Sequence, residues 1–484
     1  MIRRRVFLTN AAAIAAACYI AALPLFVLFA DATYPLAARL AAWLLFVVGT
    51  VPTVVYLRGA RSYVPVVELV QLAFVSAFSL PVFYERELAF FARTIYPDTV
   101  PVTACILLAV VAVSALWCGY KLGPNVFARV PLPRFQFRCV PERLFYYAIA
   151  LGIASMIRTD SFGPFEQVVN AVASQDLITA LLALLFYKKV LAMWQKALAV
   201  AVVAGFVVNG ISTGMTQAML QPAMIWFICR WIVVKKLEIS LVVGAVLAVI
   251  LIQPVKLQYR DIAWTTTTPM SHTEKVALFG DLFVKHWLGA EIGSARVSAS
   301  SANRTSLLLQ TAHILDWSPE VVPYENGHTY MYLVVGWVPR FLWPDKPIAQ
   351  VANNKYALNY GVTTEEGIER TMFGVGELGE AIMNFGAVGV FPVFLILGIL
   401  TYIPLRLLTL PNFERLRAEP LHADHIGALA VLVAVVARLI FIGSSTAGVY
   451  GGIVQLILVQ AALMYLCAGD KSAVARPRVR VRLR

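Results

Sequence analysis

Long apolar runs are the feature that most constrains what this chain can fold into. About 20 apolar residues cross the hydrocarbon core of a bilayer as a helix, because a helix satisfies its own backbone hydrogen bonds there. Of the 484 residues, 60% are hydrophobic and only 14% are charged, which excludes a soluble domain. We therefore predict an all-α polytopic membrane protein with about twelve transmembrane helices. The predicted spans lie near residues 6–30, 34–57, 64–83, 100–120, 143–157, 166–187, 196–210, 215–234, 238–255, 376–405, 424–443 and 446–468.

The basic residues between these runs predict the orientation of the chain. Lys and Arg accumulate in the cytoplasmic loops of membrane proteins. A cytoplasmic N-terminus places most of the 40 Lys and Arg residues inside, and the even number of spans brings the C-terminus to the same side. The net charge of +13 thus follows the predicted topology, and no nucleic-acid partner is expected. The six cysteines are scattered and form neither a disulfide framework nor a metal-binding pattern.

One long connection interrupts the series of short loops and divides the chain into four predicted segments. Its basic and acidic residues nearly cancel, so its translocation does not conflict with the charge rule. Long loops usually carry function, so we expect the chemistry on the outer face. The segments are a nine-helix bundle (1–255), a large periplasmic loop with short helices (256–371), three C-terminal helices (372–468) and a basic cytoplasmic tail (469–484).

The loop contains arginines suited to an anionic ligand. Arg260 follows the ninth predicted span directly, and Arg304 falls in the first turn of a helix predicted over 301–315. The free N–H groups of a helix start and a guanidinium can converge on a pyrophosphate. The alternative is an arginine that pairs with Asp316 or Glu291, or that is simply solvated.

The segment from Asn326 to Pro347 is the strongest local signal. Residues 329–338 are apolar but too few to cross a bilayer, which is typical of a re-entrant or interfacial segment. Arg340 and Lys346 follow among aromatic residues and prolines, where they would form a cationic patch at the interface. Ordinary interfacial anchoring is the alternative explanation.

Polar residues also enter the predicted spans. Glu377, Glu380 and Asn384 share one helical stripe at the start of the tenth span, where carboxylates require a wet or protein-lined environment. Glu377 or Glu380 could act as a general base or could orient the arginines. For Asp176 and Arg438 a structural ion pair is the simpler interpretation.

These motifs resemble those of the Wzy-type oligosaccharide repeat unit polymerases. The resemblance covers about a quarter of the chain and implies a C-type glycosyltransferase fold, inversion at the anomeric carbon and no metal or other cofactor. Gly379 departs from the family, which more often has a bulkier residue there. The matching elements are Arg304, Gly327-His328-Thr329-Tyr330, Pro339-Arg340, Trp343-Pro344-Asp345-Lys346-Pro347, Gly376-Glu377 and Asn384-Phe385-Gly386 with Gly389.

The function expected from this resemblance is polymerisation of undecaprenyl-pyrophosphate-linked repeat units at the periplasmic face of a bacterial inner membrane. Membrane lipid, a flippase and a chain-length regulator are the further candidate partners. The alternatives are an O-antigen ligase, favoured by a loop histidine as base, and a flippase of the lipid-linked unit. The expected catalytic residues are Arg304, Arg340 and Glu377. The expected substrate-binding residues are Arg260, Lys346, Arg370, Glu380, Asn384 and Arg438.

Overall fold

The computed structural model describes most of the chain, and every regular element in the described residues is helical. These residues are 2–59, 64–83, 100–132, 135, 141–156, 166–234, 270–288, 307–335, 350–370, 373–408 and 425–467, with scattered positions in 240–263 and 338–346. The N-terminal elements are α1 (Ile2–Leu28), α2 (Leu36–Gly59), α3 (Val66–Phe74), the π-helix η1 (Val75–Ser79), the 3-10 helix η2 (Leu80–Phe83), α4 (Val102–Val126), α5 (Pro141–Met156), α6 (Glu166–Val172), α7 (Gln175–Tyr187), α8 (Met193–Thr213) and α9 (Thr216–Val234). The remaining elements are α11 (His272–Leu288), α13 (Leu308–Trp317), the 3-10 helix η4 (His328–Tyr330), α14 (Met331–Val335), α15 (Val351–Asn359), α16 (Glu365–Arg370), α17 (Gly376–Leu407), α19 (Ile426–Leu439) and α20 (Thr446–Cys467).

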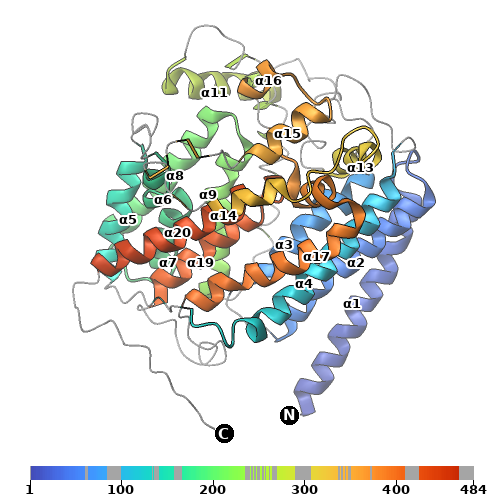
Figure 1. Cartoon of the computed structure of the whole chain (residues 1–484). Helices are drawn as coiled ribbons and strands as arrows, with labels where there is room; N and C mark the ends of the chain where they lie inside the picture. Colours follow the sequence, from blue (N-terminus) through green and yellow to red (C-terminus); the bar gives the residue numbers. More distant parts are fainter. Residues whose placement is uncertain are drawn as a thin grey trace.

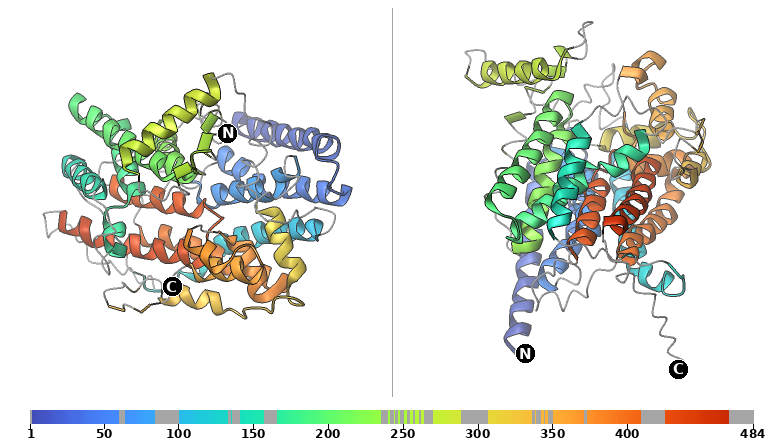
Figure 2. Two further views of the ribbon diagram at one scale, coloured as in Figure 1. Left: turned by 90° about the horizontal axis from the view of Figure 1, so that it is seen from above. Right: turned by 90° about the vertical axis from the view of Figure 1, so that its left-hand side faces the viewer.

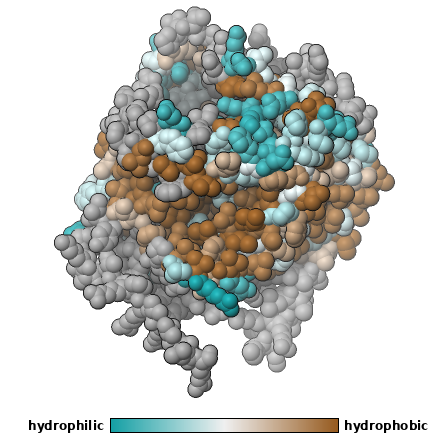
Figure 3. Space-filling model, viewed as in Figure 1, coloured by the Kyte–Doolittle hydropathy of each residue, from teal (hydrophilic) through white to brown (hydrophobic). Residues whose placement is uncertain are grey.

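Many of these helices have the length and composition of membrane spans. Among the described residues, seven helical stretches are long and apolar enough to cross a membrane: α2, α3 to η2, α4, α6 to α7, α8, α17 and α20. Parts of α1 and α9, and the whole of α19, are shorter apolar helices. Figure 3 shows a broad apolar surface across the middle of the molecule, with hydrophilic patches towards its upper and lower ends. The predicted all-helical class is confirmed. The count of twelve stays a prediction, and most of the ninth predicted span lies outside the described residues.

The apolar helices run side by side through the body of the molecule, and several helices of the long connection lie towards one end (Figures 1 and 2). Helices α11, α13, α15 and α16 all lie towards the upper end in Figure 1, and α11 lies across it. The expectation that this connection contains short helices is therefore confirmed. The segment between α13 and α17 brings its loop residues onto the start of α17.

A close contact between α4 and α17 fixes the helix that carries the buried carboxylates. A Cβ added to Gly119 would lie 2.0 Å from the carbonyl oxygen of Leu395. A Cβ added to Gly398 would lie 2.2 Å from the carbonyl oxygen of Leu116. Only glycine lets the two backbones approach this closely, as small residues do between membrane helices.

The sixth predicted span is interrupted between α6 and α7. The amide nitrogen of Gln460 donates hydrogen bonds to the carbonyls of Ala171 (2.8 Å) and Val172 (3.0 Å), which satisfies the end of α6. At the start of α7, a carboxylate oxygen of Asp176 lies 3.6 Å from Nε of Arg438. The ion pair predicted between Asp176 and Arg438 is confirmed.

Candidate functional site

The first turns of α17 carry a buried polar stripe. Glu377 is 5% exposed, and Glu380 and Asn384 are fully buried. Their spacing of three and four residues places them on one face of the helix, as predicted. This face meets α13, the loop around Gly327 and the start of α20, so the carboxylates are lined by protein.

Glu380 accepts a hydrogen bond at each carboxylate oxygen. Thr329 Oγ1 donates to Oε1 at 2.7 Å, and the backbone N–H of Thr446 donates to Oε2 at 2.7 Å. The carboxylate therefore joins the loop segment at Thr329 to the first residue of α20. With both oxygens engaged and no solvent exposure, Glu380 positions these segments.

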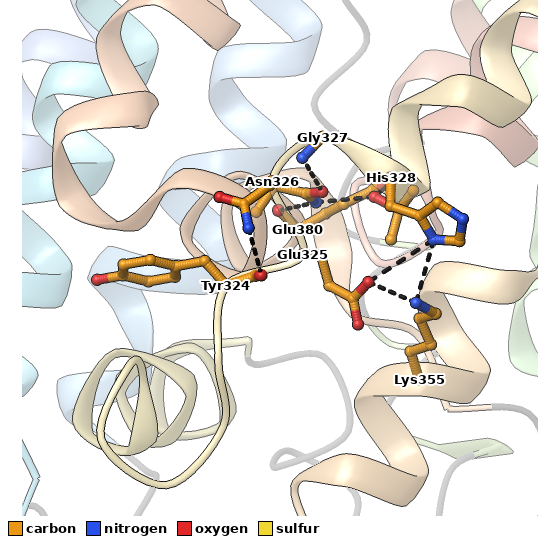
Figure 4. A network of polar contacts seen from close by, with 9 residues as sticks. Tyr324, Glu325, Asn326, Gly327, His328, Lys355 and Glu380 are labelled. Atoms are coloured by element: carbon orange, nitrogen blue, oxygen red, sulfur yellow. Dashed lines mark hydrogen bonds and ion pairs between the residues drawn. The ribbon is translucent and has the colours of Figure 1, made fainter.

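Asn384 completes this buried network, of which Gly327 and Glu380 are labelled in Figure 4. Its Nδ2 donates to Thr329 Oγ1 at 2.7 Å and to the carbonyl of Glu380 at 2.8 Å. Its Oδ1 accepts from the backbone N–H of Gly327 at 3.0 Å. Two motif blocks are thus hydrogen-bonded to each other. One is Gly327-His328-Thr329-Tyr330 in the loop, and the other runs from Gly376 to Gly389 at the start of α17.

A break in α17 makes room for the loop backbone. Gly386 has φ 65° and ψ −165°, a conformation open essentially only to glycine, and a Cβ there would lie 2.5 Å from the hydroxyl oxygen of Tyr324. In an uninterrupted helix the carbonyl of Met383 would accept from the residue four positions later. Here the carbonyls of Met383 and Asn384 accept from the N–H groups of Glu325 and Asn326, each at 3.0 Å.

The loop turns sharply directly after these contacts. Asn326 (φ 49°) and Gly327 (φ 86°) are both left-handed, and the ring of Tyr330 stacks on Phe385 with centroids 6.0 Å apart. A Cβ on Gly327 would lie 3.0 Å from Cζ of Phe385. The turn is therefore fixed against the helix by backbone bonds, a side-chain amide and an aromatic contact.

A second, more exposed cluster lies beside this turn. Lys355 of α15 forms a close ion pair with Oε2 of Glu325, and its ammonium lies 3.1 Å from Nδ1 of His328. The distance from Glu325 Oε2 to His328 Nδ1 is 3.7 Å, too long for a hydrogen bond. The side chain of His328 is 51% exposed and that of Lys355 is 29% exposed, so solutes reach both groups.

Glu377 differs from Glu380 in its contacts. Its Oε2 is buried and has no hydrogen-bond partner among the described residues. Two residues further along the helix, a Cβ on Gly379 would lie 3.0 Å from Ile314 and 3.2 Å from a methyl of Val375. Glycine at position 379, where the resembling family often has a bulkier residue, therefore lets α13 pack closely on this part of α17.

The cations expected to bind a pyrophosphate are described only in part. Arg304 and Arg340 lie outside the described residues. Arg260 is half-buried, and a Cβ on Gly214 would lie 3.1 Å from its Cγ. Lys346 is 5% exposed and donates a 2.7 Å hydrogen bond to the carbonyl of Val338.

Arg370 and Arg438 are the two remaining arginines that were expected to bind substrate. Arg370 ends α16, but its side chain lies outside the described residues. Arg438 contacts Asp176 and also donates to the carbonyl of Gly452 at 2.9 Å.

One sequence prediction in this region is wrong. The helix expected over 301–315 begins at Leu308, with Leu307 as its N-cap, and it extends to Trp317. Arg304 therefore precedes α13 and is not in its first turn. Leu308 and Ala312, which lie on one face of this helix, are fully buried. The predicted start is too early because the residues before Leu307 have the polar composition that is typical of a helix N-terminus.

Sequence reasoning also missed Glu325 and Lys355. Neither lies in a recognisable spacing, and a lysine in the polar helix α15 reads as an ordinary solvated residue. His328 and Thr329 were singled out only as part of a motif. Among the described residues, no group of three or more His, Cys, Asp or Glu side chains could hold a metal ion.

Comparison with known proteins gives one informative result. A family model described as "Domain of unknown function (DUF8712)" matches residues 88–405, which include the long connection and most of α17. Among curated proteins and among solved structures, no match is found.

Proposed function

This chain belongs to the family described as domain of unknown function (DUF8712), and we propose that it is a glycosyltransferase that polymerises lipid-pyrophosphate-linked oligosaccharide repeat units. The observation that carries the proposal is the hydrogen-bonded union of the two motif blocks. Thr329 and Gly327 of the loop bond to Glu380 and Asn384 of α17 across more than fifty positions of sequence. Residues that match the polymerase pattern in separate segments thus lie in contact, which supports the assignment of both segments to one site.

The proposed reaction places different demands on two groups of residues. A hydroxyl oxygen of the acceptor unit attacks the anomeric carbon of the donor glycan, and the bond from that carbon to the pyrophosphate oxygen breaks. The hydroxyl proton passes to a base, and the leaving pyrophosphate gains negative charge that cations must stabilise. We assign the cationic role to Arg260, Arg304 and Arg340. Inversion at the anomeric carbon and a C-type glycosyltransferase fold are parts of the same proposal.

Glu377 is the carboxylate that fits the role of base. Glu380 already accepts a hydrogen bond at each oxygen, whereas Oε2 of Glu377 has no partner among the described residues. A base needs a free lone pair within reach of the acceptor hydroxyl. We assign Glu380 and Asn384 to holding the loop turn, and Lys346, which donates to the carbonyl of Val338, to bracing the segment around Arg340.

The proposed topology has twelve spans, both termini in the cytoplasm and residues 256–371 in the periplasm of a bacterial inner membrane. Helices α11, α13, α15 and α16 of this connection lie towards one end of the apolar bundle, which supports a location of most of the connection on one side (Figure 1). A reporter active only in the periplasm should be active when fused near Ser300 and inactive when fused after Arg417. The reverse pattern would reject this orientation.

Two other functions are each favoured by one observation. The exposed histidine His328 next to a carboxylate fits an O-antigen ligase with a histidine base. Its Nδ1, however, faces the ammonium of Lys355, which occupies that lone pair. The interrupted helix α6–α7 with the Asp176–Arg438 pair fits a transporter of the lipid-linked unit.

Deletion of the gene separates the three functions by their products. Loss of a polymerase leaves cells that display a single repeat unit, because flipping and ligation continue. Loss of a ligase leaves long polymer on the lipid carrier, and loss of a flippase leaves units on the cytoplasmic leaflet. Either of the last two results would overturn the proposal.

Complementation of the deletion tests the assigned arginines. Arg304→Ala and Arg340→Ala should abolish long polymer while the protein stays in the membrane, since losing one such contact costs a rate factor of about 10²–10³. Arg296→Ala, in the same connection but outside the motifs, is the matched control and should restore full-length polymer. Full-length polymer from both motif variants would refute the assignment.

A further inference from the structure

The cluster of Glu325, His328 and Lys355 has hydrogen-bonding capacity that the contacts within the protein do not use. A lysine ammonium carries three N–H donors. In the described residues, one donor of Lys355 is directed at Glu325 Oε2 and one at His328 Nδ1. The third donor has no partner among these residues, and 29% of the Lys355 side chain is exposed.

The same contacts determine which imidazole nitrogen of His328 is free. Because the ammonium of Lys355 donates to Nδ1, a neutral imidazole carries its proton on Nε2. Figure 4 shows the other ring nitrogen directed away from both Lys355 and Glu325. His328 and Lys355 therefore offer two N–H donors at an exposed position, one on each side of the imidazole ring.

The donors are held by a rigid support. The N–H groups of Glu325 and Asn326 bond to α17, Asn384 fixes Gly327, and the N–H of His328 donates to the carbonyl of Glu325 at 2.9 Å. A non-glycine residue in the left-handed region, here Asn326, costs free energy and persists where surrounding contacts enforce it. A turn fixed in this way keeps His328 at a set distance from α15.

We propose that Lys355 and His328 form a binding site for an oxyanion of the substrate, with Glu325 as the internal counter-ion that the bound oxyanion displaces from Lys355. This inference rests on the proposed function for the identity of the substrate. A lysine ammonium and an imidazole N–H are donors that match phosphate or carboxylate oxygens. Glu325 keeps Lys355 neutralised and in place until a ligand that also accepts from His328 arrives.

Two sources on a lipid-linked glycan carry suitable oxygens. The pyrophosphate of the donor is one, and the carboxylate of a uronic acid within the repeat unit is the other. Either anion would accept from Lys355, while Nε2 of His328, on the far side of the ring, would donate to another oxygen of the same ligand. The two sources differ in charge and in whether a lipid is attached, so separate probes distinguish them.

The test measures binding to the purified full-length protein in detergent micelles. The probes are farnesyl pyrophosphate, farnesyl monophosphate, farnesol and sodium galacturonate, with affinities measured by isothermal titration calorimetry. Lys355→Met should weaken binding of the relevant anion at least ten-fold, or about 1.4 kcal/mol. Glu325→Gln should strengthen it several-fold, because the amide competes less for the ammonium. His328→Gln should give an intermediate loss.

Lys285→Met is the matched control. Lys285 is also a surface lysine in an ion pair, with Asp281 at 2.6 Å on α11, but among the described residues no hydrogen bond joins its ammonium to an imidazole. The control should bind each probe as the unmodified protein does, and farnesol should not respond to any of these variants. A preference for farnesyl pyrophosphate assigns the site to the donor, and a preference for galacturonate assigns it to the glycan.

Identical affinities for Lys355→Met and Lys285→Met would overturn the site. So would weaker binding in Glu325→Gln, since that variant removes a competitor in the proposed arrangement. Failure of this inference is distinguishable from failure of the proposed function. Anion binding at Lys355 in a protein whose deletion leaves polymer length unchanged would keep the site and reject the polymerase.

Discussion

Thr329 and Glu380, 51 positions apart in sequence, are joined by a hydrogen bond of 2.7 Å between two fully buried side chains. Thr329 Oγ1 also accepts from Asn384 Nδ2 at 2.7 Å, so one hydroxyl serves two partners on α17. A buried polar group left without a partner costs about 1–3 kcal/mol, and a carboxylate costs more. The Thr329 hydroxyl therefore holds the loop turn against α17.

Replacing Thr329 tests that statement. Thr329→Val keeps the shape but removes the donor to Glu380 and the acceptor for Asn384, so we expect a lower thermal unfolding temperature and loss of long polymer. Thr329→Ser retains the hydroxyl and should restore both. A valine variant as stable as the serine variant would show that the bond contributes little.

Gly386 provides a second test, at the break in α17. Its backbone conformation excludes a side chain, and a Cβ would lie 2.5 Å from the Tyr324 hydroxyl oxygen. Gly386→Ala should destabilise the protein by about 1–3 kcal/mol through backbone strain, with the contact against Tyr324 added to it. The change is measured as a shift in the chemical or thermal unfolding midpoint.

Gly280→Ala is the control for that variant. Gly280 lies within α11, is exposed, and has nothing within 4 Å of an added Cβ. Alanine is favoured over glycine inside a helix by about 0.5–1 kcal/mol, so this change should stabilise α11 slightly. Equal destabilisation by both variants would contradict the role assigned to Gly386.

Much of the helical framework could be predicted from apolar periodicity and length. The span expected at 376–405 is α17 from Gly376 to Leu407, and the short run expected at 196–210 is the longer helix α8. Composition predicts such helices because a segment inside a membrane must satisfy its own backbone hydrogen bonds. It does not predict an interruption that side chains from other helices stabilise. The break between α6 and α7 depends on Gln460 and Arg438, which lie far away in sequence.

The candidate site could be predicted only in part for the same reason. The stripe of Glu377, Glu380 and Asn384 follows from helical spacing, and its burial is confirmed. The partners of that stripe come from the loop turn and from α20, and no local pattern shows which segments meet. Lys355 was missed because its significance lies in its distance to Glu325 and His328.

His313 predicts a pH dependence of stability. Burial lowers the pKa of the His313 imidazole below its ordinary value of 6.5, and the hydrogen bond with the Tyr360 carbonyl and the charge of Asp316 offset this only partly. The folded protein therefore keeps the imidazole neutral where the unfolded chain binds a proton. Stability should fall as the pH drops below about 6.5 and should rise with pH through that window.

The measurement is the thermal unfolding temperature from about pH 5 to pH 8. His313→Asn removes the titrating group and should make the curve flatter, although the loss of ring contact with Trp317 lowers stability at every pH. His272→Gln, at an exposed position at the start of α11, should leave the slope unchanged. A slope that is the same in the His313→Asn variant would assign the pH dependence to other groups.

Variants of Asp176 and Arg438 can distinguish a structural role of Arg438 from a role in substrate binding. Removing one partner of a largely buried ion pair leaves an uncompensated charge, which costs on the order of 3 kcal/mol. Arg438→Met should therefore lower the unfolding temperature and the amount of protein in the membrane. Replacing both residues, with Asp176→Leu added, removes both charges and should recover most of that loss. Polymer length in the double variant then distinguishes the two roles of Arg438. If stability and polymer both recover, the pair is purely structural, whereas recovered stability without polymer would assign Arg438 to the substrate, as the sequence predicts.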